Sequence, residues 1–464
     1  MDIHKTYQET IDYLYSFVDY SLTRGFRYSP EKFDLGRMAA FMEYLGQPQQ
    51  AYPIIHVAGT KGKGSVSALC ASALRAAGYR VGFYTSPHLH DYTERIQVDN
   101  QPIGHDELVA LVDEVRPYLE AGHQLTTFEI TTALAFLYFA RQNVTAVVAE
   151  VGLGGRLDAT NVIRPCLSVI TSLSYDHTHI LGETLAEIAG EKGGIIKDNI
   201  PVVLSPQKDE ARLVIERITA ERNSRLVQVG QDILFAPVSH SLQEQTFLVW
   251  WASEQALIDA YIESGGLQEW EPTRFTIPLL GYHQVENAAT AYAALKVAQE
   301  NGLAQISDTA IRKGFQEVSW PGRFEVLQRN PTIVVDSAHN RDSALKLRLA
   351  LDDYFPGQEA ILLFGASEDK DVDGMFAELL PRVSRVIATR SFHPRAMDPD
   401  NLVELAHRLG KPARVVHEVE EALQEALSYA REDALVVVTG SLFVVAAARE
   451  CWQKMTEQQG VQNA

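Results

Sequence analysis

The chain has 464 residues, a formal net charge of −19, and a composition that is 46% hydrophobic and 22% charged. This length exceeds what one hydrophobic core usually holds, so two domains are expected, with three possible, and the composition is ordinary for a globular protein. An acidic chain lacks the basic face of a nucleic-acid binder, so local cations, backbone N–H groups or metal ions must hold any anionic substrate.

The cysteines and the apolar segments narrow the class of protein further. Cys70, Cys166 and Cys451 are few and far apart, which favours neither a disulfide framework nor a Cys-x-x-Cys metal site and suits a reducing compartment. The first residues have no basic start followed by an apolar core, so no signal peptide is predicted. The longest apolar stretch, residues 434–448, is below the ~20 residues of a membrane helix and contains a Gly-Ser break. We expect a cytoplasmic protein with neither a membrane nor a nucleic-acid partner.

The first predicted elements are a short apolar strand at 54–58, a glycine-rich segment, and a helix at 65–78. The elements that follow in the first half are a strand at 80–84, helices at about 105–120 and 126–142, and strands at 146–151 and 167–171. Short runs rich in Val and Ile that alternate with helices indicate a parallel sheet buried on both faces.

Residues 233–280 break this alternation, and we predict a small antiparallel insertion there. Helices at 285–300 and 308–315 lead to residues 319–331, whose Pro, Gly and Asn suit a domain junction. The alternation then restarts, with strands at 332–336, 360–364, 385–389, 413–417 and 434–439 and helices that begin at Arg341 and Asp398. The predicted fold class is α/β, with two doubly wound α/β domains.

Residues 56–65, HVAGTKGKGS, have features of a phosphate-binding loop but break the pattern G-x-x-x-x-G-K-[ST]. Aligned on Gly62-Lys63, the pattern needs a glycine at position 57 and a hydroxyl at position 64; neither is present, and the hydroxyl follows at Ser65. The segment still lies between a predicted strand and a predicted helix, where the helix N-terminus attracts anions. A turn that merely joins strand to helix is the alternative. We favour binding of a nucleoside triphosphate, with Lys63 at the β- and γ-phosphates.

Polar side chains follow three of the predicted strands. Ser86 comes after the strand at 80–84, Glu150 lies at the end of the strand at 146–151, and Asp176, His177 and His179 follow the strand at 167–171. Because the carboxyl ends of parallel strands meet at one edge of a sheet, these residues form a candidate Mg²⁺ site. A strand-end glutamate is also compatible with a solvated or helix-capping role, and His-x-His with a fragment of a zinc site. Since Mg²⁺ prefers oxygen ligands, a histidine ligand needs independent support.

Together these segments resemble the folylpolyglutamate synthase/dihydrofolate synthase family of the Mur ligase superfamily, over residues 30 to 450. The matching motifs, in order, are HVAGTKGKGS, TSPHL, EVGLGGRLDATN, DHTHILG, EKGGIIK, GYHQVENAA, WPGRFE, DSAHN and VTGSL. The departure from the standard phosphate loop is this family's own pattern. The chain departs from the family at Thr60-Lys61, where Thr-Asn is more frequent, and in the long segment at 233–280.

The resemblance implies an N-terminal P-loop ATP- and folate-binding domain over residues 1–321 and a C-terminal, Rossmann-like glutamate ligase domain over residues 322–464. The implied ATP-binding residues are Gly62, Lys63, Gly64, Ser65, Asn287, Arg323 and Asp336. The implied ligands of two Mg²⁺ ions are Ser86, Glu150, His177 and Lys192, the last as a carbamate. The implied catalytic residues are Lys63, Lys192, His177, Arg323 and His339. Without the family, Lys192 reads as a solvated helix lysine.

On the substrate side the resemblance implies the segment FDLGRM at 33–38 together with Thr126, Thr127, Phe128, Glu129, Leu157, Asp158, Ala159 and Ser441. An apolar slot with a polar rim suits a flat bicyclic ring, although residues 126–129 also read as a capped helix start. The implied reaction is the ATP-dependent addition of L-glutamate to the carboxylate of folate or dihydropteroate through an acyl phosphate. We expect a monomer that uses both dihydropteroate and tetrahydrofolate.

Three other functions stay open at this point. Another Mur-type amide ligase would differ in its carboxylate acceptor. A P-loop kinase or switch NTPase would leave the second α/β domain and Lys192 without a role. A non-catalytic nucleotide-binding module is disfavoured because every predicted catalytic position carries a competent side chain.

Overall fold

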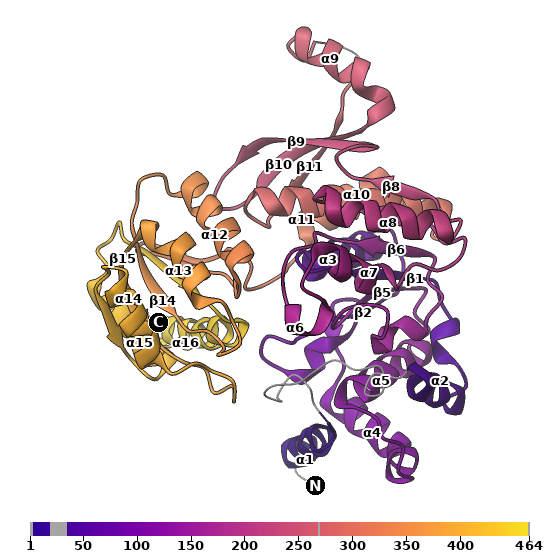
Figure 1. The fold of residues 1–464 in the computed structure, drawn as a ribbon, viewed down its shortest axis with the longest axis horizontal. Helices are drawn as coiled ribbons and strands as arrows, with labels where there is room; N and C mark the ends of the chain where they lie inside the picture. Colours follow the sequence, from indigo (N-terminus) through magenta and orange to yellow (C-terminus); the bar gives the residue numbers. More distant parts are fainter. Residues whose placement is uncertain (1–2, 19–34, 268–269, 463–464) are drawn as a thin grey trace. The chain divides into compact units, whose positions relative to one another are not determined.

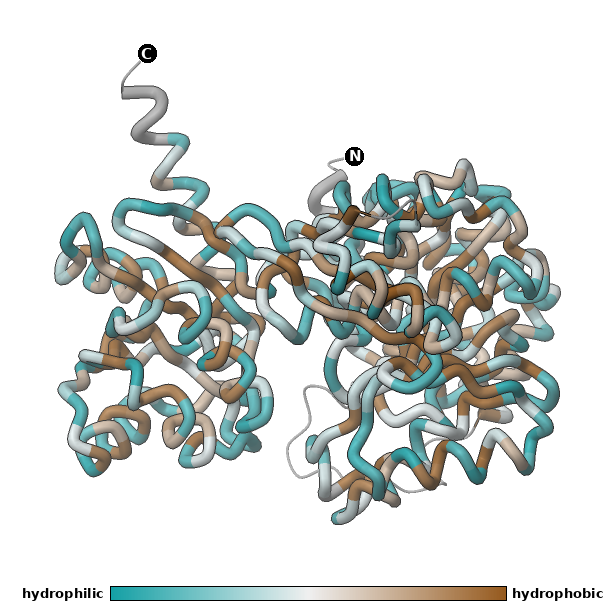
Figure 2. The backbone as a smooth tube through the Cα atoms, turned by 90° about the horizontal axis from the view of Figure 1, so that it is seen from above, coloured by the Kyte–Doolittle hydropathy of each residue, from teal (hydrophilic) through white to brown (hydrophobic). Residues whose placement is uncertain are grey.

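The computed structural model describes residues 3–18, 35–267 and 270–462 (Figure 1). The chain divides into two compact units. The first comprises Met1–Ser239, Thr246–Pro278 and Gln284–Val318, and the second comprises His240–Gln245, Leu279–His283 and Ser319–Ala464. Within each unit, hydrophobic segments run through the interior and hydrophilic loops lie outside them (Figure 2). None of the described helices is long and apolar enough to cross a membrane.

The first unit is built on an eight-stranded sheet with the order β4-β3-β2-β5-β1-β6-β7-β8. The six strands from β2 to β8 in this order pair in parallel, as predicted, whereas β3 and β4 add an antiparallel edge that the sequence did not reveal. The strands are β1 (Ile54–Ala58), β2 (Val81–Tyr84), β3 (Ile96–Val98), β4 (Gln101–Pro102), β5 (Ala146–Glu150), β6 (Leu167–Ile170), β7 (Val202–Leu204) and β8 (Leu226–Gln228).

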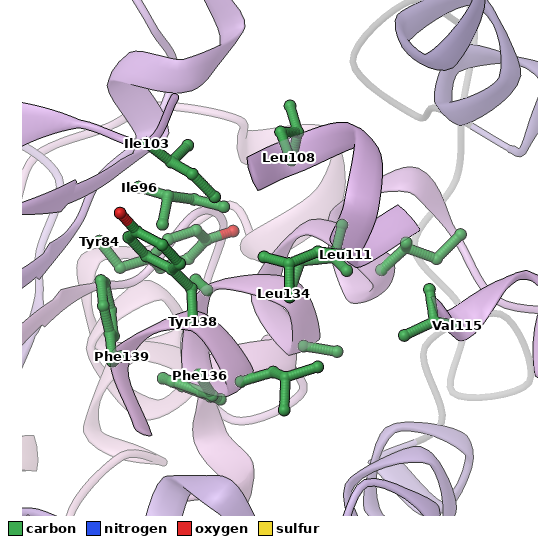
Figure 3. Packing of buried hydrophobic residues seen from close by; sticks show 14 of the residues in the cluster. Tyr84, Ile96, Ile103, Leu108, Leu111, Val115, Leu134, Phe136, Tyr138 and Phe139 are labelled. Carbon is green, nitrogen blue, oxygen red and sulfur yellow. The ribbon is translucent and has the colours of Figure 1, made fainter. Parts of the chain in front are cut away.

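Helices cover this sheet and supply much of its core. Every residue of β1, β2, β5 and β6 is buried, which is why these strands read as continuous apolar runs. Tyr84, Leu134, Phe136 and Phe139 belong to one large cluster (Figure 3). Fully burying such a side chain stabilises the fold by roughly 1.5–3 kcal/mol. The helices are α1 (Ile3–Ser16), α2 (Leu35–Tyr44), α3 (Lys63–Ala76), α4 (His105–Glu120), α5 (Thr127–Arg141), α6 (Thr178–Leu181), α7 (Leu185–Gly193), α8 (Asp209–Glu221), α10 (Tyr282–Glu300) and α11 (Asp308–Glu317).

The segment at 233–280 forms a three-stranded sheet with the order β11-β10-β9. Its strands are β9 (Ile233–His240), β10 (Gln245–Trp251) and β11 (Thr273–Ile277). Only residues 241–244 join β9 to β10, and such a short connection requires neighbouring strands to be antiparallel. The helix α9 (Gln255–Glu263) interrupts the segment and was not predicted.

The second unit has a six-stranded sheet with the order β12-β13-β17-β14-β15-β16. Alternate residues of its strands feed two clusters: Val334 and Leu362 pack with α12, α13 and α14, whereas Val335 and Leu363 pack with α15 and α16. Helices on both faces are the doubly wound arrangement that was predicted. The elements are β12 (Glu325–Arg329), β13 (Thr332–Val335), α12 (Arg341–Tyr354), β14 (Ala360–Phe364), α13 (Val372–Leu379), β15 (Val383–Ala388), α14 (Pro399–Arg408), β16 (Ala413–Val415), α15 (Val419–Tyr429), β17 (Leu435–Thr439) and α16 (Leu442–Gln462).

One strand in this region was not predicted. Residues 325–329, within the stretch interpreted as a domain junction, form β12, which pairs antiparallel with β13 at the edge of the sheet. The nearby Pro and Gly made the whole stretch look irregular, although its middle, EVLQR, alternates in side-chain character as an edge strand does.

Candidate functional site

The predicted phosphate loop lies between β1 and α3. Gly62 caps α3 with φ +85°, and Gly59 has φ +153°. A Cβ added at Gly59 would collide with Thr171, and one added at Gly62 would collide with the side-chain oxygen of Asn287. The loop therefore needs glycine for its backbone shape and for close packing. The first N–H groups of α3 have no acceptor within the helix, so the structure presents the helix N-terminus that phosphate binding requires.

Acidic and basic groups meet where β2 and β5 end beside this loop. Glu150 is only 4% exposed, and its Oε1 lies 4.0 Å from Lys63 Nζ. The other carboxylate oxygen, Oε2, accepts a hydrogen bond from Thr85 Oγ1. Ser86, the predicted magnesium ligand, is the half-buried neighbour of Thr85. The structure thus brings Lys63 and Glu150 together, and the role of Ser86 stays a prediction.

Lys192 is the site residue that departs most from its ordinary environment. It lies in the last turn of α7, is 4% exposed, and donates a hydrogen bond from Nζ to the carbonyl oxygen of Gly59 at 2.9 Å. The pKa of Lys192 is lowered to about 7. Burial is the largest cause, and the nearby positive charge of Lys63 is the second. The reading of Lys192 as a solvated helix lysine was wrong, because α7 directs the side chain beneath the phosphate loop.

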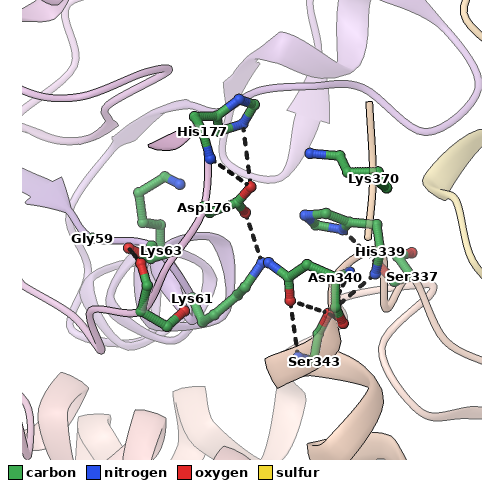
Figure 4. Close-up of polar contacts among 12 residues, drawn as sticks. Gly59, Lys61, Lys63, Asp176, His177, Ser337, His339, Asn340, Ser343 and Lys370 are labelled. Atoms are coloured by element: carbon green, nitrogen blue, oxygen red, sulfur yellow. Dashed lines mark hydrogen bonds and ion pairs between the residues drawn. The ribbon is translucent and has the colours of Figure 1, made fainter. Parts of the chain in front are cut away.

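Asp176 and His177 follow β6 and face the phosphate loop (Figure 4). Asp176 Oδ2 lies 3.0 Å from Lys61 Nζ, and Asp176 Oδ1 accepts a hydrogen bond from the backbone N–H of His177 at 3.0 Å. His177 is half-buried and has φ 49°.

The residues around the loop fit Mg²⁺ better than zinc. Across the described residues, no group of three or more His, Cys, Asp or Glu side chains could hold a metal by itself. Mg²⁺ does not require one, because it is usually held by one or two carboxylates together with substrate phosphates and water. The buried Glu150 carboxylate beside Lys63 meets that need. A zinc site would need four protein ligands or three with an open position.

Asn287 and residues 126–129 hold positions around the same sheet edge. Asn287 lies on α10 with its side-chain oxygen against Gly62, and its amide donates to Gln284 at 2.9 Å. Thr126 and Glu129 form a capping box at the start of α5, so the helix-start reading of this segment is confirmed. Thr127 Oγ1 donates to the carbonyl of Leu14 at 2.8 Å, which ties α5 to α1.

Phe128 has a different environment from its neighbours. Its ring packs directly against Gly152: a Cβ added there would lie only 2.4 Å from Phe128 Cζ, too close unless the ring moved. Gly152 opens the loop that follows Glu150, so Phe128 connects the predicted acceptor segment to the predicted metal ligand. Within the FDLGRM segment, Phe33 and Asp34 lie outside the described residues.

The loop carrying Leu157, Asp158 and Ala159 is fixed by one buried carboxylate. Asp158 accepts hydrogen bonds from the N–H groups of Gly152 and Leu153 at 3.0 and 2.9 Å, and from Thr160 Oγ1 at 2.6 Å. Burial raises the pKa of Asp158, and these hydrogen bonds oppose that rise. The carboxylate therefore shapes the loop, and direct contact with the acceptor stays a prediction.

A buried histidine ties this loop to β1. His56 Nε2 lies 2.8 Å from Thr160 Oγ1, the same hydroxyl that donates to Asp158. Because that hydroxyl proton goes to the carboxylate, His56 Nε2 must be the donor in its own contact. Burial lowers the pKa of His56 to about 3, so the ring is neutral.

In the second unit, Asp336 follows β13 and organises the turn that carries Arg323. Its Oδ2 accepts from the N–H of Phe324 at 2.8 Å and its Oδ1 from the N–H of Ala338 at 2.9 Å. Phe324 is buried with φ 44°, a conformation that bulky residues seldom adopt. Burial raises the pKa of Asp336, and the charge of Arg323 opposes that rise.

His339 and Ser441 lie at the carboxyl ends of β13 and β17, which pair in parallel. His339 Nδ1 is 2.9 Å from the carbonyl oxygen of Ser337 (Figure 4). Ser441 is buried just after β17. Lys370 lies on the segment after β14 and is drawn with His339 in Figure 4. Its Nζ is 3.5 Å from Oδ2 of the adjacent Asp369.

Thr85, Lys370 and His56 were missed by the sequence analysis. Thr85 and Lys370 follow predicted strands, so the strand-end argument applied to Glu150 would have found them. His56 carries no such signal, because a histidine within an apolar strand is indistinguishable from an ordinary core residue.

Comparison with known proteins places this geometry in a family. Residues 57–295 match the Mur ligase middle domain, and residues 322–442 match the Mur ligase glutamate ligase domain. The dihydrofolate synthase/folylpolyglutamate synthase of Bacillus subtilis is 37% identical over 423 residues, which cover 90% of this chain and 94% of that protein. The chain belongs to the folylpolyglutamate synthase/dihydrofolate synthase family. It is an ATP-dependent acid–amino acid ligase that uses glutamate.

Solved folylpolyglutamate synthases share the fold. The Mycobacterium tuberculosis folylpolyglutamate synthase complexed with ADP matches with a TM-score of 0.83 at 30% identity, over 97% of this chain and 99% of that one. An FPGS–AMPPCP–folate complex matches with a TM-score of 0.78 at 31% identity, over 96% of this chain and 98% of that one. The predicted family and fold class are therefore confirmed.

Gly62→Ala tests the phosphate loop of this family member. The substitution is expected to lower ADP affinity and to cost about 1–2 kcal/mol of stability, because a left-handed backbone would carry a Cβ that meets Asn287. Gly78→Ala is the matched control: its φ is +89°, but nothing lies within 4 Å of the added Cβ. It should lose similar stability in urea unfolding while calorimetry finds unchanged ADP affinity. Equal ADP affinity in both variants would contradict the role of Gly62.

Proposed function

We propose that this ligase adds L-glutamate both to dihydropteroate and to tetrahydrofolate. The observation that carries the proposal is the grouping of Lys63, Glu150 and Lys192 around one glycine loop, with a lysine ammonium 4.0 Å from a buried carboxylate. That grouping suits phosphoryl transfer to a carboxylate. The two activities in the name of the Bacillus subtilis relative support dual acceptor use.

In the first half-reaction the acceptor carboxylate attacks the γ-phosphorus of ATP, which gives an acyl phosphate and releases ADP. A carboxylate is a poor electrophile, and phosphorylation supplies the leaving group it lacks. Lys63 neutralises phosphate charge, and the N–H groups of Gly64 and Ser65 at the start of α3 bind phosphate oxygens. Asn287 positions the loop through its contact with Gly62. Two Mg²⁺ ions, held by Ser86, Glu150, His177 and carbamylated Lys192, would supply the remaining positive charge.

The environment of Lys192 supports its carbamylation. Burial lowers its pKa most, the charges of Lys63 and Lys61 lower it as well, and Asp176 and Asp158 raise it. A carbamate replaces the positive charge by a negative one, so the two lysines would attract it, and bound Mg²⁺ would offset its repulsion from the two aspartates. It also supplies the oxygen donors that Mg²⁺ prefers and that Lys192 otherwise lacks.

In the second half-reaction the α-amine of L-glutamate attacks the acyl phosphate. The tetrahedral intermediate collapses to an amide and inorganic phosphate, and one proton is released. We assign the glutamate to His339, Ser441 and Lys370. Because the carbonyl of Ser337 only accepts, Nδ1 of a neutral His339 carries the proton and Nε2 is the basic nitrogen, which suits removal of a proton from the amine. Arg323 and Asp336 are assigned to ATP.

The acceptor ring is assigned to Phe128 with Leu157 and Ala159, which offer apolar surface beside the loop that Asp158 shapes. Thr126, Thr127 and Glu129 complete the predicted rim. Arg37, from the FDLGRM segment, has its guanidinium 3.6 Å from Glu129, which joins two of the predicted acceptor segments. The cytoplasmic location and the monomeric state stay predictions.

The test is ATP- and Mg²⁺-dependent incorporation of labelled L-glutamate. Incorporation is expected with dihydropteroate and with tetrahydrofolate, and ADP formation beyond one turnover should require both the acceptor and glutamate. Incorporation into neither, but into a nucleotide-linked muramyl acceptor, would move the chain to another Mur-type specificity. Continuous ADP production over many turnovers without any amine would favour a kinase or NTPase.

A further inference from the structure

Lys61 is the residue of the phosphate loop at which this chain departs from the family's more frequent Thr-Asn pair. The Lys61 ammonium pairs with a carboxylate instead of extending into solvent. Lys61 Nζ lies 3.0 Å from Asp176 Oδ2, and the two side chains are only 12% and 10% exposed (Figure 4). The substitution therefore introduces a largely buried ion pair between the phosphate loop and the segment after β6.

Four contacts join these two segments, at residues 172, 174 and 176 of the segment after β6. The backbone N–H groups of Thr60 and Lys61 both donate to the carbonyl of Ser172 at 3.0 Å, and Thr60 Oγ1 donates to the carbonyl of Ser174 at 3.2 Å. The Lys61–Asp176 pair is the next contact and extends furthest toward the turn at His177. The other three contacts reach residues 172 and 174 of that segment.

Asp176 also contacts His177, so the ion pair with Lys61 restrains the turn at His177 as well. Its second oxygen, Oδ1, accepts the hydrogen bond from the backbone N–H of His177 at 3.0 Å, and His177 Nε2 is 3.8 Å from the same oxygen. His177 has φ 49°, a left-handed conformation that costs free energy and persists only where its surroundings hold it. The Asp176 carboxylate, held in place by Lys61, stabilises this conformation of His177.

We propose that Lys61 is a positioning residue that holds the His177 turn against the phosphate loop through Asp176. An asparagine at position 61 is shorter by two bonds, carries no charge, and cannot form the same ion pair with the carboxylate. The consequence for catalysis rests on the proposed function, because it requires His177 to serve the metal and phosphate site. The other role open to a lysine here is direct contact with a phosphate of the nucleotide, and the two roles predict different results.

The variants are Lys61→Asn, Asp176→Asn, the double variant, and the conservative Lys61→Arg. The matched control is Lys296→Asn, because Lys296 forms an exposed pair with Asp308 at 3.2 Å in the same unit. Three quantities are measured: kcat in the labelled-glutamate assay, the Kd of ADP without Mg²⁺, and amide hydrogen exchange of residues 174–181 without any ligand.

Lys61→Asn and Asp176→Asn should each lower kcat about 10- to 100-fold, the range found for residues that orient metal-site side chains. The double variant should be no worse than the poorer single variant, because both remove the same contact. Amide exchange at 176–181 should accelerate in Lys61→Asn, the ADP Kd should change by less than about 3-fold, and Lys61→Arg should restore kcat. Lys296→Asn should leave all three quantities unchanged.

A loss of ADP affinity in Lys61→Asn alone, with Asp176→Asn unaffected, would overturn the proposal in favour of direct phosphate contact. Additive effects in the double variant, or unchanged exchange at 176–181, would overturn it as well. The exchange measurement needs no substrate, so it decides the positioning role even where wild-type protein incorporates no glutamate, a result that would instead refute the proposed function.

Discussion

Lys63→Ala is expected to lower kcat for glutamate ligation by at least about 10²–10³-fold, while the protein stays folded. The Lys63 ammonium lies 4.0 Å from the buried Glu150 carboxylate, and Lys63 begins the helix whose N-terminus is proposed to bind the phosphates. Its removal leaves the loop backbone intact, because that backbone is shaped by Gly59 and Gly62. It deletes a point charge from the position where negative charge develops during phosphoryl transfer.

The measurements are ligation with saturating ATP, and urea unfolding to verify the fold. Lys313→Ala is a suitable control, since Lys313 is an exposed lysine of α11 whose partner, Glu317, is 3.9 Å away on the same helix. It should behave as wild type in both experiments. Wild-type ligation by a folded Lys63→Ala would remove Lys63 from the phosphate site.

The phosphate loop and most strands were predictable because local signals determine them. Buried parallel strands are mostly apolar, so β1, β5 and β14 can be recognised as short apolar runs, interrupted only by His56 in β1 and ended by Glu150 in β5. A loop that packs its backbone against Thr171 and Asn287 must contain glycine. In contrast, β7 and β8 have three residues each and offer too short a pattern to separate from a loop.

The site was less predictable because burial of its polar groups depends on the tertiary structure. Nothing in EKGGIIK indicates that Lys192 lies beneath a loop more than a hundred residues earlier in the chain. The hydrogen bond from Thr85 to Glu150 was also missed, because successive residues at a strand end point to opposite sides and the sequence does not show which of them faces the carboxylate. The predicted role of Ser86 as a magnesium ligand is a separate matter and stays a prediction. The antiparallel edge formed by β3 and β4 also depends on pairing that periodicity does not reveal.

Lys192→Ala is expected to lose ligation and to regain part of it when a short-chain carboxylic acid such as acetate or propionate is added. Carbamylation requires the neutral amine, which attacks CO₂ and loses one proton to give a carbamate. With its pKa lowered to about 7, roughly half of Lys192 is neutral at pH 7, whereas an exposed lysine is neutral in only about one molecule in 10³. Burial thus prepares this lysine for the modification, and the small acid would place a carboxylate where the carbamate stood.

The matched control is Lys197→Ala, because Lys197 belongs to the same EKGGIIK segment and donates to the carbonyl of Asn161 at 3.0 Å. Its burial also lowers its pKa, but its contact is with the loop after Glu150 rather than with the phosphate loop. Lys197→Ala is expected to lose stability without any gain from added acid. Removing dissolved CO₂ should inactivate the wild type most strongly below pH 7. There the ammonium form of Lys192 dominates, so traces of CO₂ that remain find little neutral amine to carbamylate. Full activity of Lys192→Ala, equal rescue of both variants, or a protein map with no CO₂ adduct at position 192 would each count against the carbamate.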